Sequence, residues 1–161
     1  MKPRAFLELV LTAVVVVLLL SGLPFAIREF QETGEVYLFS RRFLEDLVAR
    51  LSGPGRLRFI LQPAVAIFLG VRDGRGDARA GLAPFLYSLV FRAGERRSLV
   101  SGAFASVRNL VAMAILVDMG SQFLIFRQVH TGAALVLGPV LIAAPYALSR
   151  AFSNRLAKRQ S

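Results

Sequence analysis

The sequence contains no cysteine and no tryptophan, and His130 is its single histidine. The lack of cysteine excludes disulfides, thiolate metal sites and a cysteine nucleophile. His130 has no second histidine or acidic cluster beside it to form a metal site, and no serine or threonine has an evident histidine and carboxylate to activate it. We therefore expect no enzymatic activity and no cofactor. Ligation of a haem or chlorophyll by His130 is the alternative to a simple anchor at a membrane surface.

Acidic residues are also scarce, because ten Asp and Glu face twenty Lys and Arg, giving a formal net charge of +10. In a soluble protein this balance would suggest nucleic acid as the partner. However, 55% of the residues are hydrophobic and the mean hydropathy is +0.59. This composition favours a membrane protein, in which basic residues collect on the cytoplasmic side. We therefore expect a lipid bilayer and no nucleic acid as the partner.

Four apolar segments predict an all-α integral membrane bundle of about four transmembrane helices, with one or two amphipathic helices at the interface. The predicted spans are residues 5–27, 57–71, 108–126 and 131–149, followed by a basic tail at 150–161. The first segment would extend about 34 Å as a helix, which crosses a bilayer. A cleaved signal peptide is the competing interpretation, but the apolar run is long and lacks a small-x-small cleavage site after Pro24.

The second segment is short, since residues 57–71 would extend only about 22 Å. Pro63 follows Gln62 inside it, so we expect a kink or a broken helix. The glycine-rich and charged residues 72–81 predict a cytoplasmic turn, and residues 82–91 are too few to span. A strained crossing is the preferred interpretation of residues 57–91, and a re-entrant hairpin is the alternative.

The distribution of basic residues predicts the topology. With four crossings and a cytoplasmic N-terminus, twelve Lys and Arg fall inside and seven outside. Arg56 and Arg58 lie on the less favourable side. The sequence therefore predicts a bacterial inner-membrane protein with both termini in the cytoplasm.

Residues 40–52 predict an amphipathic helix, capped by Ser40 and ended by Gly53-Pro54. Its apolar face comprises Phe43, Leu44, Leu47, Val48 and Leu51. The opposite face predicts the pairs Arg41/Glu45, Arg42/Asp46 and Asp46/Arg50. Such a helix lies at the membrane interface, on a partner subunit or on its own protein.

Two polar sites stand out. Asp118 falls near the middle of its predicted span, where a charge is costly, and Gln122 lies one turn away on the same face. Gln62 is the expected partner from another helix. A proton relay or ion site is the functional interpretation of this group, and a buried polar helix interface is the structural one. Separately, Arg72, Arg75 and Arg79 are candidates for contact with anionic lipid, and a solvated turn with local ion pairs is the alternative.

Small residues recur at four-residue spacing, which favours close helix contact. They are Ser98, Gly102 and Ser106, then Ala143, Ala147 and Ala151. The stretches "RFILQPAVAIFLGVRDGRGDARAG" and "DMGSQFLIFRQVHTGAALVLGPVLIAAPYALSRAFSNR" resemble a family of small uncharacterised bacterial inner-membrane proteins over about residues 57–155. That family tends to have Tyr-Pro where this chain has His130-Thr131, so a shared role for His130 is not expected. The resemblance implies membrane topology and no activity.

We therefore predict a non-catalytic accessory or scaffolding subunit of a larger bacterial membrane complex, with a respiratory or photosynthetic assembly as a natural host. It would act through helix packing and contacts with lipid and other membrane subunits. A small transporter or proton-coupled module centred on Asp118 is the alternative.

Overall fold

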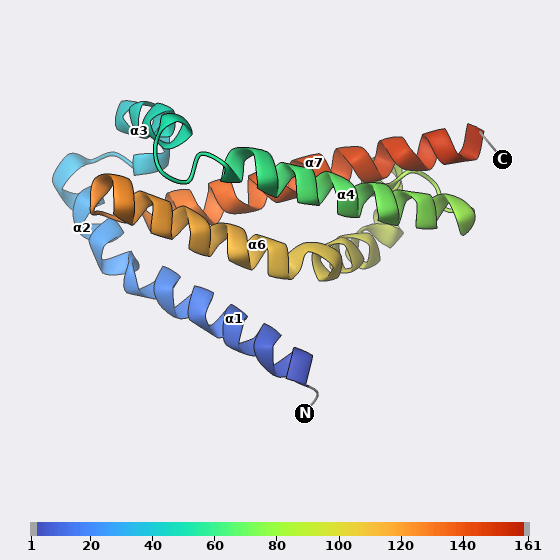
Figure 1. The fold of residues 1–161 in the computed structure, drawn as a ribbon, viewed down its shortest axis with the longest axis horizontal. Helices are drawn as coiled ribbons and strands as arrows, with labels where there is room; N and C mark the ends of the chain where they lie inside the picture. Colours follow the sequence, from blue (N-terminus) through green and yellow to red (C-terminus); the bar gives the residue numbers. More distant parts are fainter. Residues whose placement is uncertain (1–2, 160–161) are drawn as a thin grey trace. The chain divides into compact units, whose positions relative to one another are not determined.

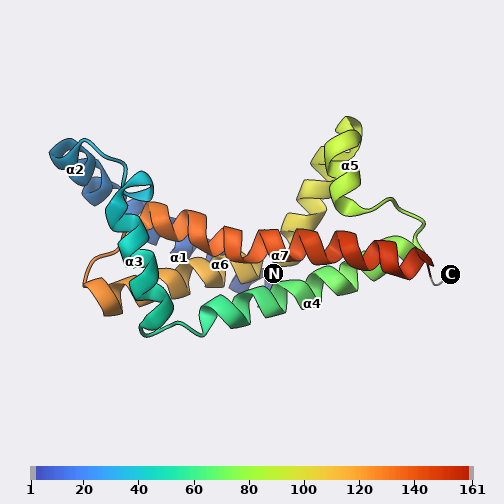
Figure 2. The same ribbon diagram turned by 90° about the horizontal axis from the view of Figure 1, so that it is seen from above.

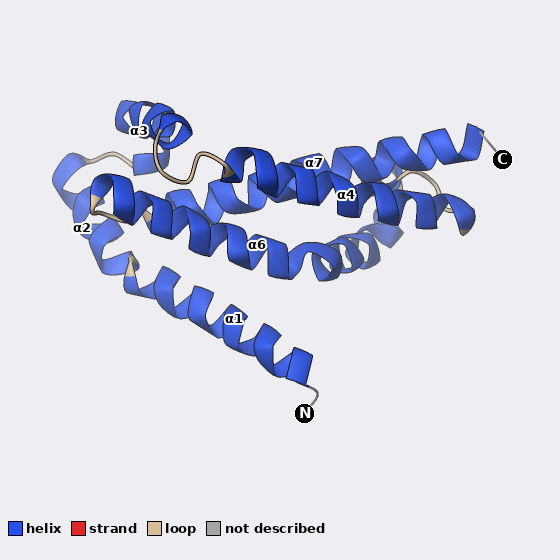
Figure 3. Ribbon diagram, viewed as in Figure 1, coloured by secondary structure: helices blue, strands red, loops and turns tan. Residues whose placement is uncertain are grey.

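The computed structural model describes residues 3–159, and these form helices joined by short loops, without a strand (Figures 1 and 3). The elements are α1 (Pro3–Ser21), α2 (Leu23–Thr33), the 3-10 helix η1 (Tyr37–Phe39), α3 (Arg41–Ser52), α4 (Arg58–Arg79), α5 (Phe85–Phe91), the 3-10 helix η2 (Ala93–Glu95), α6 (Arg96–Phe126) and α7 (Thr131–Arg159). The predicted all-α class is confirmed. Lys2 and the end of the predicted tail, residues 160–161, lie outside the described residues.

Three helical segments are long and apolar enough to cross a membrane: Phe6–Thr33, Ala93–Phe126 and Thr131–Arg159. They include most of the predicted spans 5–27, 108–126 and 131–149. The predicted span 57–71 falls within α4 but does not qualify, because every 18-residue stretch of α4 contains at least three charged residues.

The first candidate span is divided in two. Residues 5–27 do not form one helix, since α1 ends at Ser21 and α2 begins at Leu23, with Pro24 in its first turn. Between them lies Gly22, where a Cβ would collide with the side chain of Thr131 at the start of α7. The close approach to α7 therefore requires glycine at this division, and α2 is a second amphipathic helix that ends at Gly34 in a left-handed conformation.

The described chain forms two compact units. The first contains the chain up to Phe59 together with Val111–Pro139. Its apolar core is formed by Val15, Ile115, Met119 and Ala134. In this unit α3 lies beside the last turns of α6 (Figures 1 and 2), and Ser40 caps α3 by accepting a hydrogen bond from the Phe43 N–H at 3.2 Å. The predicted helix 40–52 and its cap are confirmed.

The second unit contains Ile60–Leu110 and the chain from Val140 onward. In it, α4 packs closely on α7 through Gly70 and Gly74. A Cβ at Gly70 would collide with Ser149 and the Tyr146 carbonyl, and one at Gly74 with Ser153 and the Arg150 carbonyl. This glycine pair at four-residue spacing lets the two backbones approach, as small residues do in membrane helix pairs.

The predicted turn at residues 72–81 is wrong, because α4 continues as a helix to Arg79 and the chain reverses only at Ala80–Pro84. Gly74 serves helix contact rather than a turn, and Gly81 has the positive φ of 72° that ends the helix. The helix is not broken at Pro63, which lies inside continuous α4, and the alternative of a kink there stays a prediction.

The predicted basic tail belongs to α7, which stays helical to Arg159. Its residues hold the reversal after α4: Asn154 Nδ2 donates to the Leu82 carbonyl at 3.2 Å, and Lys158 Nζ donates to the Gly81 carbonyl at 3.2 Å. Those bonds satisfy backbone carbonyls of the reversal itself, just beyond the end of α4.

The glycine contact predicts opposite effects for two alanine substitutions in α4. Gly74→Ala should destabilise the fold by about 1 to 3 kcal/mol, because its Cβ forces α4 away from the backbone of α7. Gly76→Ala is the matched control, since a Cβ at Gly76 meets nothing within 4 Å. It should stabilise the helix by about 0.5 to 1 kcal/mol. Chemical unfolding in detergent measures both, and equal effects would contradict the contact.

Candidate functional site

The most unusual feature of the first unit is a buried carboxylate that contacts two buried guanidinium groups. Asp118 in α6 is 2% exposed. Its Oδ1 lies 2.5 Å from Nη2 of Arg58 and 3.6 Å from Nη1 of Arg50, and both arginine side chains are at most 3% exposed. Two cations and one anion are thus removed from solvent together, in an arrangement that we call the Asp118 cluster.

The two arginines reach Asp118 from different segments. Arg50 extends from the polar face of α3, and Arg58 is the first residue of α4. Each guanidinium also lies over an aromatic ring: Arg50 is 5.7 Å from the centroid of Phe126, and Arg58 is 4.7 Å from that of Phe59. These cation–π contacts offset part of the cost of burying a second positive charge.

The other carboxylate oxygen joins the cluster to the turn between α6 and α7. Gln122 Nε2 donates to Asp118 Oδ2 at 2.7 Å, as expected for residues one helical turn apart. Gln122 Oε1 accepts from the backbone N–H of His130 at 2.8 Å. The orientation of the Asp118 carboxylate and the path of the loop before α7 are therefore fixed together.

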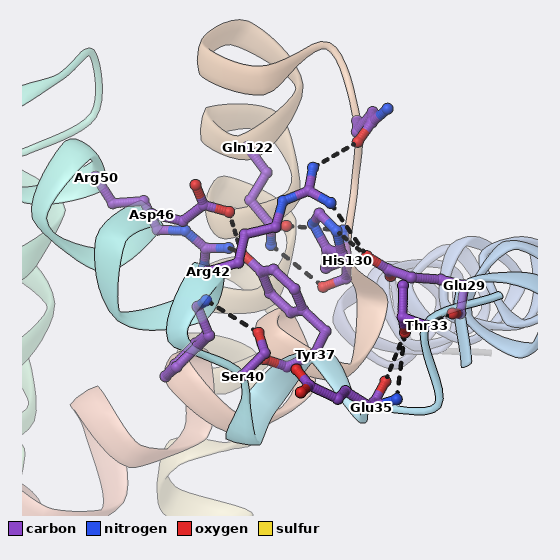
Figure 4. Close-up of polar contacts among 12 residues, drawn as sticks. Glu29, Thr33, Glu35, Tyr37, Ser40, Arg42, Asp46, Arg50, Gln122 and His130 are labelled. Atoms are coloured by element: carbon purple, nitrogen blue, oxygen red, sulfur yellow. Dashed lines mark hydrogen bonds and ion pairs between the residues drawn. The ribbon is translucent and has the colours of Figure 1, made fainter. Parts of the chain in front are cut away.

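His130 contacts two aromatic rings. Its ring stacks on Tyr37 with centroids 3.6 Å apart (Figure 4). Phe25 meets it edge-on at 5.9 Å. His130 Nε2 lies 3.3 Å from Glu29 Oε1, while Arg42 Nη1 lies 3.5 Å from the same oxygen. The Tyr37 hydroxyl donates to Asp46 at 2.6 Å and accepts from Arg50 at 3.2 Å, which connects this group to the Asp118 cluster.

Burial shifts the pKa values of His130 and Tyr37. Burial lowers the pKa of His130 below its usual value, and the Glu29 carboxylate opposes that shift. Burial also raises the pKa of Tyr37, and its hydrogen bond to Asp46 acts in the same direction. Near neutral pH the imidazole is therefore neutral and the phenol stays protonated.

A cavity of about 150 Å³ adjoins this stack. It is lined by α2, by residues 35–38 and by the start of α7, including Phe25, Glu29, Tyr37 and His130. Asp118 is not among the lining residues. No three His, Cys, Asp or Glu side chains within residues 3–159 could hold a metal ion together.

The structure brings together only part of the predicted polar interface. Asp118 and Gln122 are hydrogen-bonded and buried, whereas Gln62 belongs to the second unit, where its Oε1 is buried without a hydrogen-bond partner. The pairing of Asp118 with Gln62 stays a prediction. His130, considered as a pigment ligand, contacts Glu29 through Nε2, and its Nδ1 is buried.

The predicted apolar face of α3 divides into two parts. Phe43 and Leu47 are half-buried, while Leu44, Val48 and Leu51 are 62%, 66% and 51% exposed. Among the predicted ion pairs, Arg41/Glu45 is present at 3.0 Å. The other two give way to longer-range contacts, because Arg42 meets Glu29 and Gln128, Asp46 accepts from Tyr37, and Arg50 reaches Asp118.

Sequence reasoning missed the partners of Asp118. A signal was present, since Arg58 lies on the less favourable side of the predicted topology and Asp118 is the acidic residue near the middle of a predicted span. A single buried acid and an unfavourably placed arginine favour each other as partners. Tyr37 and Glu29 gave no comparable signal, because their contacts depend on how η1 and α2 meet the loop before α7.

The Asp118 cluster and the three long apolar helices are typical of an all-helical membrane protein, in which buried charges pair within the fold. This class rests on the length and composition of the helices. Comparison with protein-family models, curated proteins and solved structures found no match. The resemblance to small inner-membrane proteins is therefore untested.

The cluster predicts that Asp118→Asn destabilises the protein by about 3 to 5 kcal/mol. The substitution keeps the shape of the side chain but leaves two buried arginines without a counter-charge. Glu32→Gln is the control, because it removes one carboxylate from an exposed position in the same unit. Unfolding in detergent compares the two, and a loss no larger for Asp118→Asn than for the control would contradict the cluster.

Proposed function

We propose that this chain is a non-catalytic accessory or scaffolding subunit of a larger bacterial inner-membrane complex, with a respiratory or photosynthetic assembly as a natural host. It acts by packing its helices against other subunits and by contacts at the lipid interface. The observation that carries this proposal is the orientation of α3. Arg50 anchors α3 on Asp118 with Phe43 and Leu47 half-buried, and this leaves Leu44, Val48 and Leu51 facing outward.

This exposure is unusual for a helix that covers its own core, since only Phe43 and Leu47 of its apolar face are half-buried. Leu44, Val48 and Leu51 lie on one side of α3 at i, i+4 and i+7, and Phe39 just before it is 90% exposed. An apolar surface of this kind is unfavourable in water and marks contact with a protein or membrane. Because the helix is held by a buried ion pair, it forms a rigid platform for such a contact.

The first candidate span supports the same proposal. Within residues 6–33 only Val15 is buried, so the apolar surface of α1 and α2 is almost entirely open to lipid or to a partner. Gly102 in α6 belongs to one of the small-residue faces, and a Cβ there meets nothing within 4 Å. Such faces permit close contact with a helix from another subunit.

Four crossings with both termini in the cytoplasm are part of the proposal. The 22 residues of α4 extend about 33 Å, enough for a crossing if its charged last turns lie among headgroups. Two of the basic residues counted outside, Arg50 and Arg58, are buried against Asp118 and weigh little in the positive-inside count. Both points support a crossing over a re-entrant hairpin.

Engineered cysteines test this topology directly, because the chain has no cysteine of its own. With four crossings, an impermeant maleimide added to intact cells should label Ser52→Cys, whereas Gly76→Cys and Lys158→Cys should react only after the membrane is opened. These sites are exposed in the fold. If Ser52→Cys and Gly76→Cys react from the same side, α4 does not cross.

The transporter alternative centres on Asp118, and the geometry of the Asp118 cluster does not favour it. The carboxylate contacts two arginines and a glutamine, and the cavity in this unit is lined by other residues. Loss of function in Asp118→Asn would not by itself establish transport, because the fold depends on the same carboxylate. Transport measured in liposomes with correctly folded protein would revive this alternative.

Purification in mild detergent, followed by native mass spectrometry, tests the subunit proposal. We expect a complex heavier than the lone chain, and we expect Leu44→Ser with Val48→Ser to reduce recovery of the partner at least about tenfold, because both side chains lie on the exposed apolar face. Arg41→Ser with Glu45→Ser, on exposed positions of the same helix, is the matched control. Recovery of the wild-type chain as a monomer would overturn the proposal.

A further inference from the structure

One face of α4 changes from apolar to basic along its length. Six residues at alternating spacings of four and three share this face, within an arc of about 80° around the helix axis. They form what we call the α4 stripe: Leu61, Val65, Phe68, Arg72, Arg75 and Arg79. All six are exposed, and the three apolar members are 58%, 45% and 69% exposed.

The opposite face of α4, which carries Asp73 and Asp77, packs against α7. Gly70 and Gly74 approach α7, as described above. Asp73 accepts from the Tyr146 hydroxyl at 2.7 Å, and Asp77 pairs with Arg150 at 2.7 Å. The close contact with α7 therefore requires the stripe to face away from it.

Because the acids point toward α7, the arginines of the stripe are poorly compensated. Arg72 pairs with Asp73 at 2.9 Å but stays 59% exposed. Arg75 and Arg79 have no ion-pair partner among residues 3–159. Three guanidinium groups thus stand in a row of about 10 Å with roughly two positive charges unpaired.

We propose that the α4 stripe binds an anionic phospholipid, with its phosphate on the stripe arginines and its acyl chains along the stripe's apolar residues. The proposal rests on the membrane placement given under Proposed function. A bilayer changes from hydrocarbon to charged headgroup along its normal, and the stripe changes from apolar to basic along the helix axis in the same way. Guanidinium groups bind phosphate by paired, charge-assisted hydrogen bonds.

An acidic protein partner is the competing occupant, but the stripe fits lipid better. A protein interface would need carboxylates placed opposite each arginine and a separate apolar patch opposite Phe68. A single phospholipid supplies both chemistries in the required order. Exposed arginines beside membrane helices are also typical contacts of anionic lipids in the cytoplasmic leaflet.

Native mass spectrometry of the purified full-length chain, titrated with phosphatidylglycerol or phosphatidylcholine, tests the proposal. We expect the wild-type chain to prefer phosphatidylglycerol, and each arginine to contribute about fivefold. The triple variant Arg72→Gln, Arg75→Gln, Arg79→Gln should lose at least about tenfold in apparent affinity for phosphatidylglycerol. Phosphatidylcholine binding should change less than about twofold.

The matched control is Arg28→Gln, Arg41→Gln, Arg56→Gln, which removes the same charge from exposed positions outside the stripe. Its phosphatidylglycerol affinity should stay within about twofold of wild type. A second variant, Arg75→Gln with Gly76→Arg, restores the net charge but moves one arginine about 100° around the helix axis from position 75, to about 60° from the middle of the stripe, so it should stay weakened. Thermal unfolding checks that each variant is folded.

Three results would overturn the proposal: no preference of the wild-type chain for phosphatidylglycerol, equal loss in the two triple variants, or full recovery in the Gly76→Arg variant. Capture of a protein partner that depends on the stripe arginines, without lipid selectivity, would assign the stripe to a protein instead. Lipid selectivity in a chain that purifies as a monomer would remove the subunit proposal and leave the lipid site. Extraction of the chain from membranes by alkaline carbonate would remove both.

Discussion

The first unit depends on the contact between Asp118 and two arginines that share its burial. A carboxylate out of water needs a counter-charge, and here Arg50 and Arg58 supply it from α3 and from the start of α4. The contact thereby fixes α3 and the start of α4, which are neighbours along the chain, against the distant α6. It also fixes the rotation of α3 about its axis, which leaves Leu44, Val48 and Leu51 exposed.

The second unit is held by a different means, since small residues rather than charges bring its helices together. Gly70 and Gly74 allow the α4 backbone to lie against α7, and the polar bonds of Asp73 and Asp77 then form at the edge of that contact. Without a hydrophobic effect to drive helices together in lipid, close van der Waals contact and interhelical hydrogen bonds must supply the stability. The same contact leaves Arg72, Arg75 and Arg79 on the outside. In both units, the contacts made in the interior determine which side chains remain exposed on the surface.

Several features could be predicted from the sequence because they depend on residues close together in the chain. The apolar lengths identified three helices able to cross a membrane, and Ser40 and Gly53 marked the two ends of α3. Asp118 was recognisable as a costly residue at depth, and Gln122 as its neighbour one turn away. These predictions succeed because helix length, capping and i, i+4 contacts are local properties.

The structural roles of the glycines and the partners of the charged residues could not be predicted without the tertiary structure. Residues 72–81 contain the glycine and aspartate residues typical of turns, yet most of them are helical. The packing of Gly74 against α7 stabilises the helix by more than the low helix propensity of glycine destabilises it. Arg50 had a local partner in Asp46 but contacts Asp118, since a fully buried carboxylate attracts it more strongly than a partly buried one does. The sequence by itself therefore determined the all-α class and the three segments that are long and apolar enough for a membrane. The tertiary structure alone decided which charges pair and which faces stay open, because both depend on contacts between residues distant in the chain.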